Sequence, residues 1–247
     1  SRPFSRILVV TPSARLGDHV QLLVSRRLKP TAGIAFTTLS KLADPFVWEA
    51  GGLSDEDGKA LTVVSDPLFF DTLVKLILRA DRPFTELDNL AVPDGFPPSV
   101  RSTLRDLMDA GVNPEDLLAA VNEREEFNIP EVDAGTLKQL IHLHRLYLAR
   151  ITAMNVAPKS RLHQEAVGLV PGSKWLAGFD AVLFYGFYDL TGLQVALFDA
   201  IARAHPAVHF FFPYRHGHPD HAFSAHFRDD ILFKIPHEEI VLPVASD

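Results

Sequence analysis

The segment 181–194, Ala-Val-Leu-Phe-Tyr-Gly-Phe-Tyr-Asp-Leu-Thr-Gly-Leu-Gln, constrains the fold more than any other part of the chain. Its first five residues form an unbroken apolar and aromatic run, which is typical of a strand buried inside a parallel sheet. Gly186 interrupts this run, and the pattern after it predicts a helix over about 191–203. Ligands in parallel α/β sheets usually bind at the carboxyl ends of strands. We therefore expect any functional site near residues 185–194.

The first fifty residues repeat the same strand-to-helix pattern twice. Residues 7–10 and 33–38 are predicted strands. Ser13 is a suitable N-cap for a helix that ends near residue 28, and a second helix is expected over 39–49. This β-α-β-α order predicts a doubly wound sheet with helices on both faces.

Helical periodicity replaces strands between residues 53 and 170, so we expect an almost wholly helical insert there. This insert would interrupt an α/β core formed by 1–52 and 171–247. The expected features are a helix start at 54–57, an apolar stripe of Leu68, Leu73, Leu76 and Ile77, and helices over 99–110, from 113 onward and over 133–154. After the insert, we expect a strand at 208–212, a helical piece near 222–232 and a strand at 239–242.

Composition excludes several classes of protein. The sequence contains no cysteine, which excludes disulfides, zinc sites built on thiolates and cysteine nucleophiles. No apolar run approaches the roughly 18 to 20 residues of a membrane span, and no signal peptide is recognisable. We therefore expect a cytoplasmic location and no membrane partner.

The net charge of −7 is unevenly distributed. Residues 1–50 contain 7 Lys/Arg and 3 Asp/Glu, residues 51–135 contain 7 and 18, and residues 136–247 contain 10 of each. The basic start could face a polyanion, although an excess this small is more often a solvated surface. Arg26 and Arg27 close the first predicted helix, where cations also suit the negative end of the helix dipole.

Familiar catalytic and metal motifs are absent or incomplete. Gly58-Lys59 is followed by Ala60 in place of Ser or Thr, so it is not a phosphate-binding loop. Histidines cluster late in the chain, and His216, His218, Asp220 and His221 have the spacing of a metal site. Loops rich in His, Pro and Gly are more often solvated, so we predict neither a metal nor a cofactor. The carboxylates of 115–133 follow polar helix surfaces, and Gly-x-Ser-x-Gly does not occur.

The order of several segments, more than any single motif, resembles one family. Residues 7–15 and 36–42 resemble a strand ending in a Pro-containing turn and the following strand–helix segment. Residues 107–117 resemble a recurrent phrase of a helical insert, and 185–194 followed by 208–214 resemble a Gly-Phe-x-x-x-Thr-x-x-Gln element with its next strand. Together they resemble the N-terminal helicase-like region of the AddB-type ATP-dependent nuclease subunit, which is related to superfamily 1 helicases of the UvrD/RecB kind. The resemblance covers about residues 7–230.

The resemblance implies a RecA-like fold, like that of P-loop NTPases, with an insert like domain 1B. This sequence also differs from the family's pattern at important positions. Active relatives carry a Walker B motif, Asp-Glu-Phe-x-Asp, whose two acids bind Mg²⁺ and activate water. Here Tyr185 and Gly186 stand at those positions. Phe187, Asp189 and Gln194 remain, and Asp189 is expected to cap the helix over 191–203. The family's Walker A loop would precede residues 7–10, and its nuclease motif would lie beyond residue 247.

The resemblance therefore implies an ATPase-inactive domain of a larger AddB-like subunit that acts in double-strand-break processing, where the parent protein would be the ATP-dependent enzyme. This chain would act as a scaffold that contacts a helicase or nuclease partner subunit and the backbone of DNA, either a single strand or a duplex end. The candidate backbone contacts are Thr11, Ser13, Arg15, Thr38, Arg26 and Arg27. Two alternatives remain open: an enzyme of an unrecognised nucleotide-binding or hydrolase-like type, and a module that binds other proteins through the acidic helices.

Overall fold

A computed structural model describes residues 5–27, 32–83, 95–126, 134–212, 214 and 224–240. The chain forms two compact units. We name residues 1–42, 176–190 and 198–247 the sheet unit, and residues 43–175 and 191–197 the helical unit. The boundaries of these two units differ from the boundaries predicted for the α/β core and the helical insert. The predicted boundaries remain a prediction. None of the helices in the described ranges is long and apolar enough to cross a membrane.

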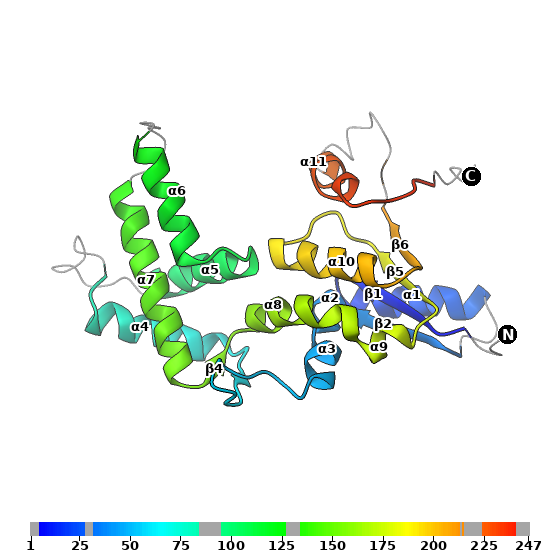
Figure 1. Cartoon of the computed structure of the whole chain (residues 1–247), viewed down its shortest axis with the longest axis horizontal. Helices are drawn as coiled ribbons and strands as arrows, with labels where there is room; N and C mark the ends of the chain where they lie inside the picture. The colour runs from blue at the N-terminus through cyan, green and yellow to red at the C-terminus, as the bar shows by residue number, and fades with distance from the viewer. Residues whose placement is uncertain are drawn as a thin grey trace. The chain divides into compact units, whose positions relative to one another are not determined.

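Four parallel strands form the sheet of the sheet unit: β1 (Ile7–Thr11), β2 (Ile34–Thr38), β5 (Ala181–Tyr185) and β6 (Val208–Phe211). Their order is β2-β1-β5-β6, so β1 and β5 lie in the centre (Figure 1). All three pairings are parallel. The α/β class and the parallel sheet predicted from sequence are thus confirmed.

Each face of this sheet is packed against a helix. On one face, Thr11 of β1 lies against α1 (Ala14–Arg27), because its Oγ1 is 3.1 Å from where a Cβ on Gly17 would stand. On the other face, Phe184 of β5 packs edge-to-face on Phe198 of α10 (Gly192–Ala204), with ring centroids 4.9 Å apart. Helix α10 begins in the helical unit and continues into the sheet unit from residue 198.

The core beneath α10 is aromatic. Phe184 is fully buried and stacks on Phe210 of the neighbouring strand at 5.9 Å. Phe210 also contacts Phe187, Phe198 and Phe227, the last from α11 (Ala225–Asp230). Rings of this size dominate the burial energy of a small core, and edge-to-face pairs add further stabilisation. The short helix η4 (Leu232–Lys234) follows α11.

Several predicted boundaries near the sheet are wrong. The helix predicted over 39–49 is two helices, α2 (Leu39–Leu42) and α3 (Asp44–Glu49), because Pro45 in the first turn of α3 cannot continue a preceding helix. Residues 239–240 do not form the predicted strand, and residues 241–242 lie outside the described residues.

The helical unit is built mainly from helices, with one small pair of parallel strands that the sequence did not reveal. After α3 its elements are β3 (Thr62–Val63), α4 (Pro67–Ala80), α5 (Phe96–Asp109), α6 (Pro114–Glu126), α7 (Ala134–Ala153), β4 (Val156–Ala157), α8 (Lys159–Leu169), η2 (Val170–Gly172) and α9 (Lys174–Ala177). β3 pairs with β4. The core of α4, α5 and α7 buries Leu73, Val74, Ile77, Leu104, Leu143, Tyr147 and Ile151.

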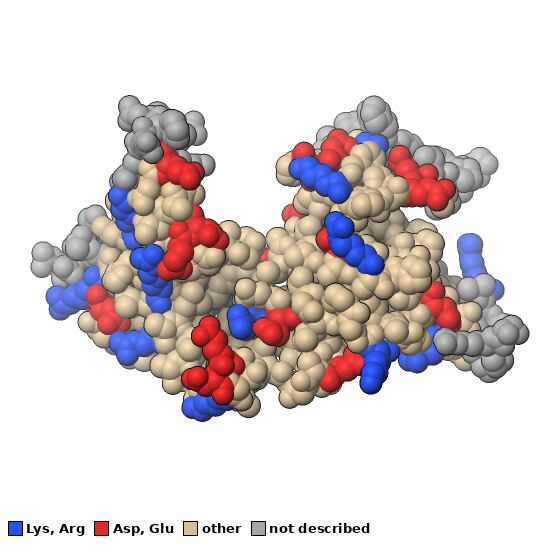
Figure 2. Space-filling model, viewed as in Figure 1, with Lys and Arg blue, Asp and Glu red and all other residues tan. Residues whose placement is uncertain are grey.

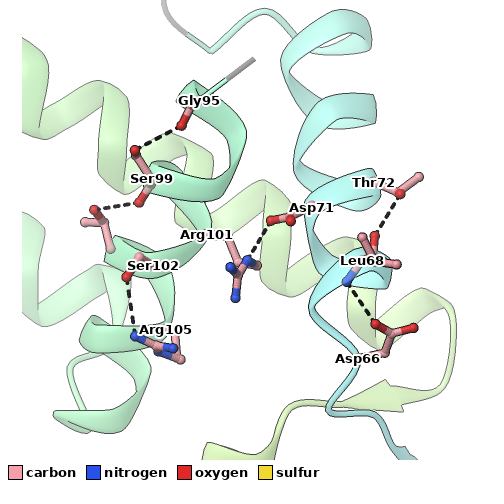
Figure 3. Close-up of polar contacts among 10 residues, drawn as sticks. Asp66, Leu68, Asp71, Thr72, Gly95, Ser99, Arg101, Ser102 and Arg105 are labelled. Atoms are coloured by element: carbon pink, nitrogen blue, oxygen red, sulfur yellow. Dashed lines mark hydrogen bonds and ion pairs between the residues drawn. The ribbon is translucent and has the colours of Figure 1, made fainter. Parts of the chain in front are cut away.

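The start of α4 corrects the prediction for this region. Residues 54–57 do not begin a helix, because the Asp55 carboxylate accepts from the backbone N–H of Asp57 and Lys59 and stabilises a turn. The helix begins after Asp66, whose side chain accepts from the N–H of Leu68 at 2.9 Å (Figure 3). Leu68 and Leu76 of the predicted apolar stripe are exposed, whereas its other members are buried.

A half-buried ion pair joins α4 to α5. Arg101 Nε donates to Asp71 Oδ1 at 2.6 Å, and both side chains are mostly covered (Figure 3). Charge-assisted hydrogen bonds of this length are stronger than neutral ones. The pair fixes the register between the two helices beside their shared apolar core.

His144 of α7 is a polar residue buried in the helical unit. Only 1% of it is exposed, and neither ring nitrogen has a partner in the described part of the chain. Burial lowers the pKa of His144 below its ordinary value of 6.5, and the charge of Glu115 opposes this shift. The folded chain therefore holds a neutral imidazole here.

We expect His144→Leu to remove an acid-sensitive element from the helical unit. The unfolded chain takes up a proton at this position below pH 6.5 and the folded chain does not, so wild-type stability falls as pH drops through that region. The variant should lack this component and match or exceed the wild type at pH 7, because a buried unpaired polar group is lost. Thermal unfolding of both proteins between pH 5 and 8 gives the comparison. Equal slopes in the two proteins would contradict the prediction.

Glu49, the last residue of α3, binds the chain where it enters α9. Its carboxylate accepts from Ser173 Oγ at 2.7 Å and from the backbone N–H groups of Lys174 at 2.9 Å and Trp175 at 3.3 Å. The Ser173 hydrogen bond is the largest cause that lowers the pKa of Glu49 below its ordinary 4.5, with smaller contributions from the two backbone groups. Residues more than 120 positions apart in sequence are thereby held together.

We expect Glu49→Gln to reduce the acid sensitivity of the fold. The contribution of a carboxylate with a lowered pKa is fully present above 4.5 and is lost as pH falls through the lower folded-state value. The wild type should thus lose stability below pH 4.5 more steeply than the variant. Denaturation midpoints measured across this range test it. Glu56→Gln, at an exposed position, is the matched control and should leave the slope unchanged.

Candidate functional site

The polar residues at the carboxyl ends of β1 and β2 bind one another. Thr11 is buried, and its hydroxyl donates to the carbonyl of Ser13 at 3.0 Å. Ser13 Oγ accepts from the N–H of Leu16 at 3.3 Å, which confirms Ser13 as the N-cap of α1. Thr38 Oγ1 and Ser40 Oγ are 3.0 Å apart. These hydroxyl groups therefore stabilise the turns that follow the strands.

The end of β5 is closed by an apolar contact. Gly186 has a φ of +82°, a conformation that side-chain-bearing residues rarely adopt. A Cβ on Gly186 would stand 2.5 Å from Leu16 Cδ2 and 3.8 Å from Pro12 Cδ. Because α1 lies this close to Gly186, a side chain at this position would meet Leu16.

The next residues of the segment 185–194 make structural contacts. Phe187 is buried and contacts Phe184 and Phe210. The prediction that Asp189 caps α10 is wrong, because its carboxylate accepts from the adjacent N–H of Leu190 at 2.8 Å. Gln194 Oε1 instead accepts from the N–H of Thr191 at 3.0 Å. Thr191 and Gln194 have the Thr-x-x-Gln spacing of a capping box, which explains this contact.

An aromatic pair lies on the α1 side of the sheet. Parallel partners point to the same face, so Tyr185 and its partner Phe211 lie opposite to Phe184 and Phe210. Their ring centroids are 6.4 Å apart, and Tyr185 and Phe211 are 43% and 40% exposed. His209, two residues before Phe211 on the same face, is exposed as well. The sequence reasoning missed this surface because it requires the register of β5 with β6.

The cations of α1 are exposed. Arg15, Arg26 and Arg27 are all solvent-accessible, and no ion pair involves any of them within the described ranges. At 100° per residue, Arg15, His19 and Arg26 share one side of the helix. Arg15 and His19 flank Leu16, the residue that meets Gly186. Four of the six residues predicted to contact the DNA backbone thus lie on α1 or at its N-cap. The other two are Thr11, which is buried, and Thr38, which lies at the end of β2.

Charge elsewhere is mixed. On the face drawn in Figure 2, basic and acidic side chains are interspersed over the helical unit and form no field of one sign. Many are paired, including Arg145 with Glu115 at 2.9 Å and Arg161 with Glu165 at 3.5 Å. Arg15, Arg26 and Arg27 of α1 differ from these, because none of them forms an ion pair with a described residue.

Histidines are potential metal ligands, but His205 has a structural role. His205 Nε2 lies 3.0 Å from the carbonyl of Phe179, and its Nδ1 accepts from the N–H of Ala207 at 3.2 Å. Among the described residues, no three His, Cys, Asp or Glu side chains are grouped so that they could hold a metal ion. His216, His218, Asp220 and His221 lie outside the described residues.

No protein-family model matches this sequence, and comparison with curated proteins gives no significant match.

Proposed function

We propose that this chain is an ATPase-inactive, RecA-like domain of a larger AddB-like nuclease subunit, and that it serves as a scaffold which also binds the DNA backbone. The observation that carries the proposal is the end of β5, where Tyr185 and Gly186 replace the two acids and Leu16 packs on the glycine. Phosphoryl transfer in this fold depends on carboxylates that bind Mg²⁺ and position water. Here the corresponding space is apolar.

The strand order supports the fold assignment. A parallel sheet with two central strands, β1 and β5, and a helix after each gives the strand-to-helix turns on which RecA-like domains build their nucleotide site. In this chain the hydroxyl groups that follow β1 and β2 are engaged locally: Thr11 Oγ1 donates to the backbone carbonyl of Ser13, and Thr38 Oγ1 lies 3.0 Å from Ser40 Oγ. An enzyme would need polar groups free to converge on a substrate, so the scaffold is favoured over the alternative of an unrecognised enzyme.

The inactive character is tested directly with Mg-ATP. The purified chain should neither bind nor hydrolyse ATP in calorimetry and phosphate-release assays, because no carboxylate stands at the end of β5. Hydrolysis that is abolished by a substitution within this chain would refute the proposal.

DNA-backbone binding is tested with the triple variant Arg15→Gln, Arg26→Gln and Arg27→Gln. Single-stranded DNA should bind the wild type in a strongly salt-dependent manner, and losing three phosphate contacts should reduce the slope of log K against log salt by about 2. Fluorescence anisotropy over a range of salt concentrations measures this slope. The matched control removes three exposed cations of the helical unit, Lys59, Lys75 and Arg79, and should leave the slope unchanged. Salt-insensitive or undetectable binding would contradict this part of the proposal.

A further inference from the structure

Among the described residues, the α1 side of β5 and β6 is less covered than the faces of parallel sheets normally are. Such sheets are usually buried on both faces by helices. On the α1 side, α1 lies against β1 at Gly17 and reaches the end of β5 through Leu16. Beyond it, the residues of β5 and β6 on this face include the exposed Tyr185, His209 and Phe211.

The chemistry of this open surface fits nucleobases. Two aromatic rings with centroids 6.4 Å apart and both more than a third exposed offer flat apolar faces to solvent. Base–aromatic stacking tolerates any sequence, since every base has a π-face. A third exposed ring, Tyr188, follows β5 in the same turn.

The charge beside this surface fits phosphates. Leu16 meets the end of β5, and Arg15 and His19 lie next to Leu16 on the exposed side of α1. Arg26 lies about 16 Å further along the same side of the helix, from a rise of about 1.5 Å per residue. Residues 1–42 contain seven Lys/Arg and a single acidic residue, Asp18. Arg15 and His19 thus lie near the end of β5, and exposed cations near exposed aromatic rings are the arrangement that single-strand binders use.

We propose that Tyr185 and Phe211 form a stacking platform for the bases of a single-stranded nucleic acid, whose phosphates contact Arg15, Arg26 and Arg27. The inference rests on the proposed backbone binding and adds that the bases themselves are bound. Duplex DNA keeps its bases paired and stacked on one another, so this platform selects single strands. Tyr185, at the position of the Mg²⁺-binding acid in the resembling helicases, would thereby stack on bases.

The experiment uses the full chain and three labelled probes: an oligothymidylate of about 12 nucleotides, an abasic strand of equal length, and a duplex. The double variant Tyr185→Ala/Phe211→Ala should bind the oligothymidylate about tenfold or more weakly, while its binding of the abasic strand stays unchanged. Tyr185→Phe should retain wild-type affinity. The arginine triple variant should lose affinity for both strands. Trp48→Ala, which removes an exposed aromatic ring of the helical unit, is the matched control.

A second readout reports stacking itself. The emission of 2-aminopurine within the strand should be quenched on binding to the wild type and remain bright with the double variant, because stacked bases lose fluorescence when they contact an aromatic ring. Circular dichroism melting of the variants checks that the fold is retained; both rings are exposed, so the melting temperature should change little.

The outcomes separate this inference from the proposed function. If the arginine variant loses binding and the aromatic variant binds both strands like the wild type, the stacking platform is refuted and backbone binding stands. If the wild type binds no strand, the DNA part of the proposed function fails, and the platform fails with it. Equal affinity for the duplex, displacement by thymidine monophosphate at equal nucleotide concentration, or self-association that the double variant abolishes would each overturn the inference.

Discussion

Replacing Phe184 with alanine should cost about 3–5 kcal/mol of unfolding free energy, because the substitution leaves a cavity at the centre of the sheet unit. Phe184 is fully buried, and its ring contacts Phe198 at 4.9 Å, Phe210 at 5.9 Å and Phe187 at 6.1 Å. These partners come from separate elements and cannot all move to fill the space. Hydrogen exchange should show lost protection first in β1, β5 and β6, and denaturant titration gives the total loss.

The matched control is Phe211→Ala on the neighbouring strand. Phe211 is the same residue type but 40% exposed, so its removal should cost about 1 kcal/mol or less. A loss at Phe184 no larger than that at Phe211 would mean that the aromatic cluster does not support the sheet. The same control shows whether the sheet unit tolerates the loss of Phe211, one of the two rings removed in the base-stacking test.

Replacing Ile77 with alanine should have the largest effect on the helical unit. Ile77 is 1% exposed within the apolar core formed by α4, α5 and α7, which also contains Leu104 and Tyr147. Truncating a buried isoleucine removes its burial energy and adds a cavity term, in total about 2–5 kcal/mol. Protection of amides in α4, α5 and α7 should fall accordingly.

The neighbouring residue provides a control on the same helix. Leu76 is 58% exposed, and Leu76→Ala should change the unfolding free energy by less than about 0.5 kcal/mol. Helix propensity favours alanine at both positions, so the difference between the two variants measures burial. Equal losses at Ile77 and Leu76 would show that the two residues are not distinguished by burial as described.

The predicted strands were reliable where local signals agreed. The strand at 181–185 has the bounds of β5, and the predicted N-cap at Ser13 begins α1. Apolar runs of β-branched residues bounded by Pro and Gly leave few local alternatives. The predicted apolar stripe of α4 was wrong at Leu68 and Leu76, which are exposed. Periodicity shows which residues share a face of a helix, but it does not show how much of that face the neighbouring helices cover.

At the candidate site, some features could be predicted from the sequence and others could not. The sequence alone showed that positions 185 and 186 carry no carboxylate, since residue identity decides whether a carboxylate exists. It also placed Arg15, Arg26 and Arg27 on one helix. The sequence did not indicate that Asp189 accepts from the N–H of Leu190 or that Gln194 accepts from the N–H of Thr191. Several side-chain oxygens compete for the same N–H groups, and only the backbone geometry selects one of them.

The sequence by itself determined the parallel α/β class, the helical character of the middle of the chain and the absence of carboxylates at positions 185 and 186, because these follow from local periodicity and residue type. Only the tertiary structure decided that Leu16 closes the space at Gly186 and that Tyr185 and Phe211 lie together in the open. Both depend on strand register and on the placement of α1 against the sheet. Those are set by contacts between residues far apart in the sequence, which no local pattern encodes.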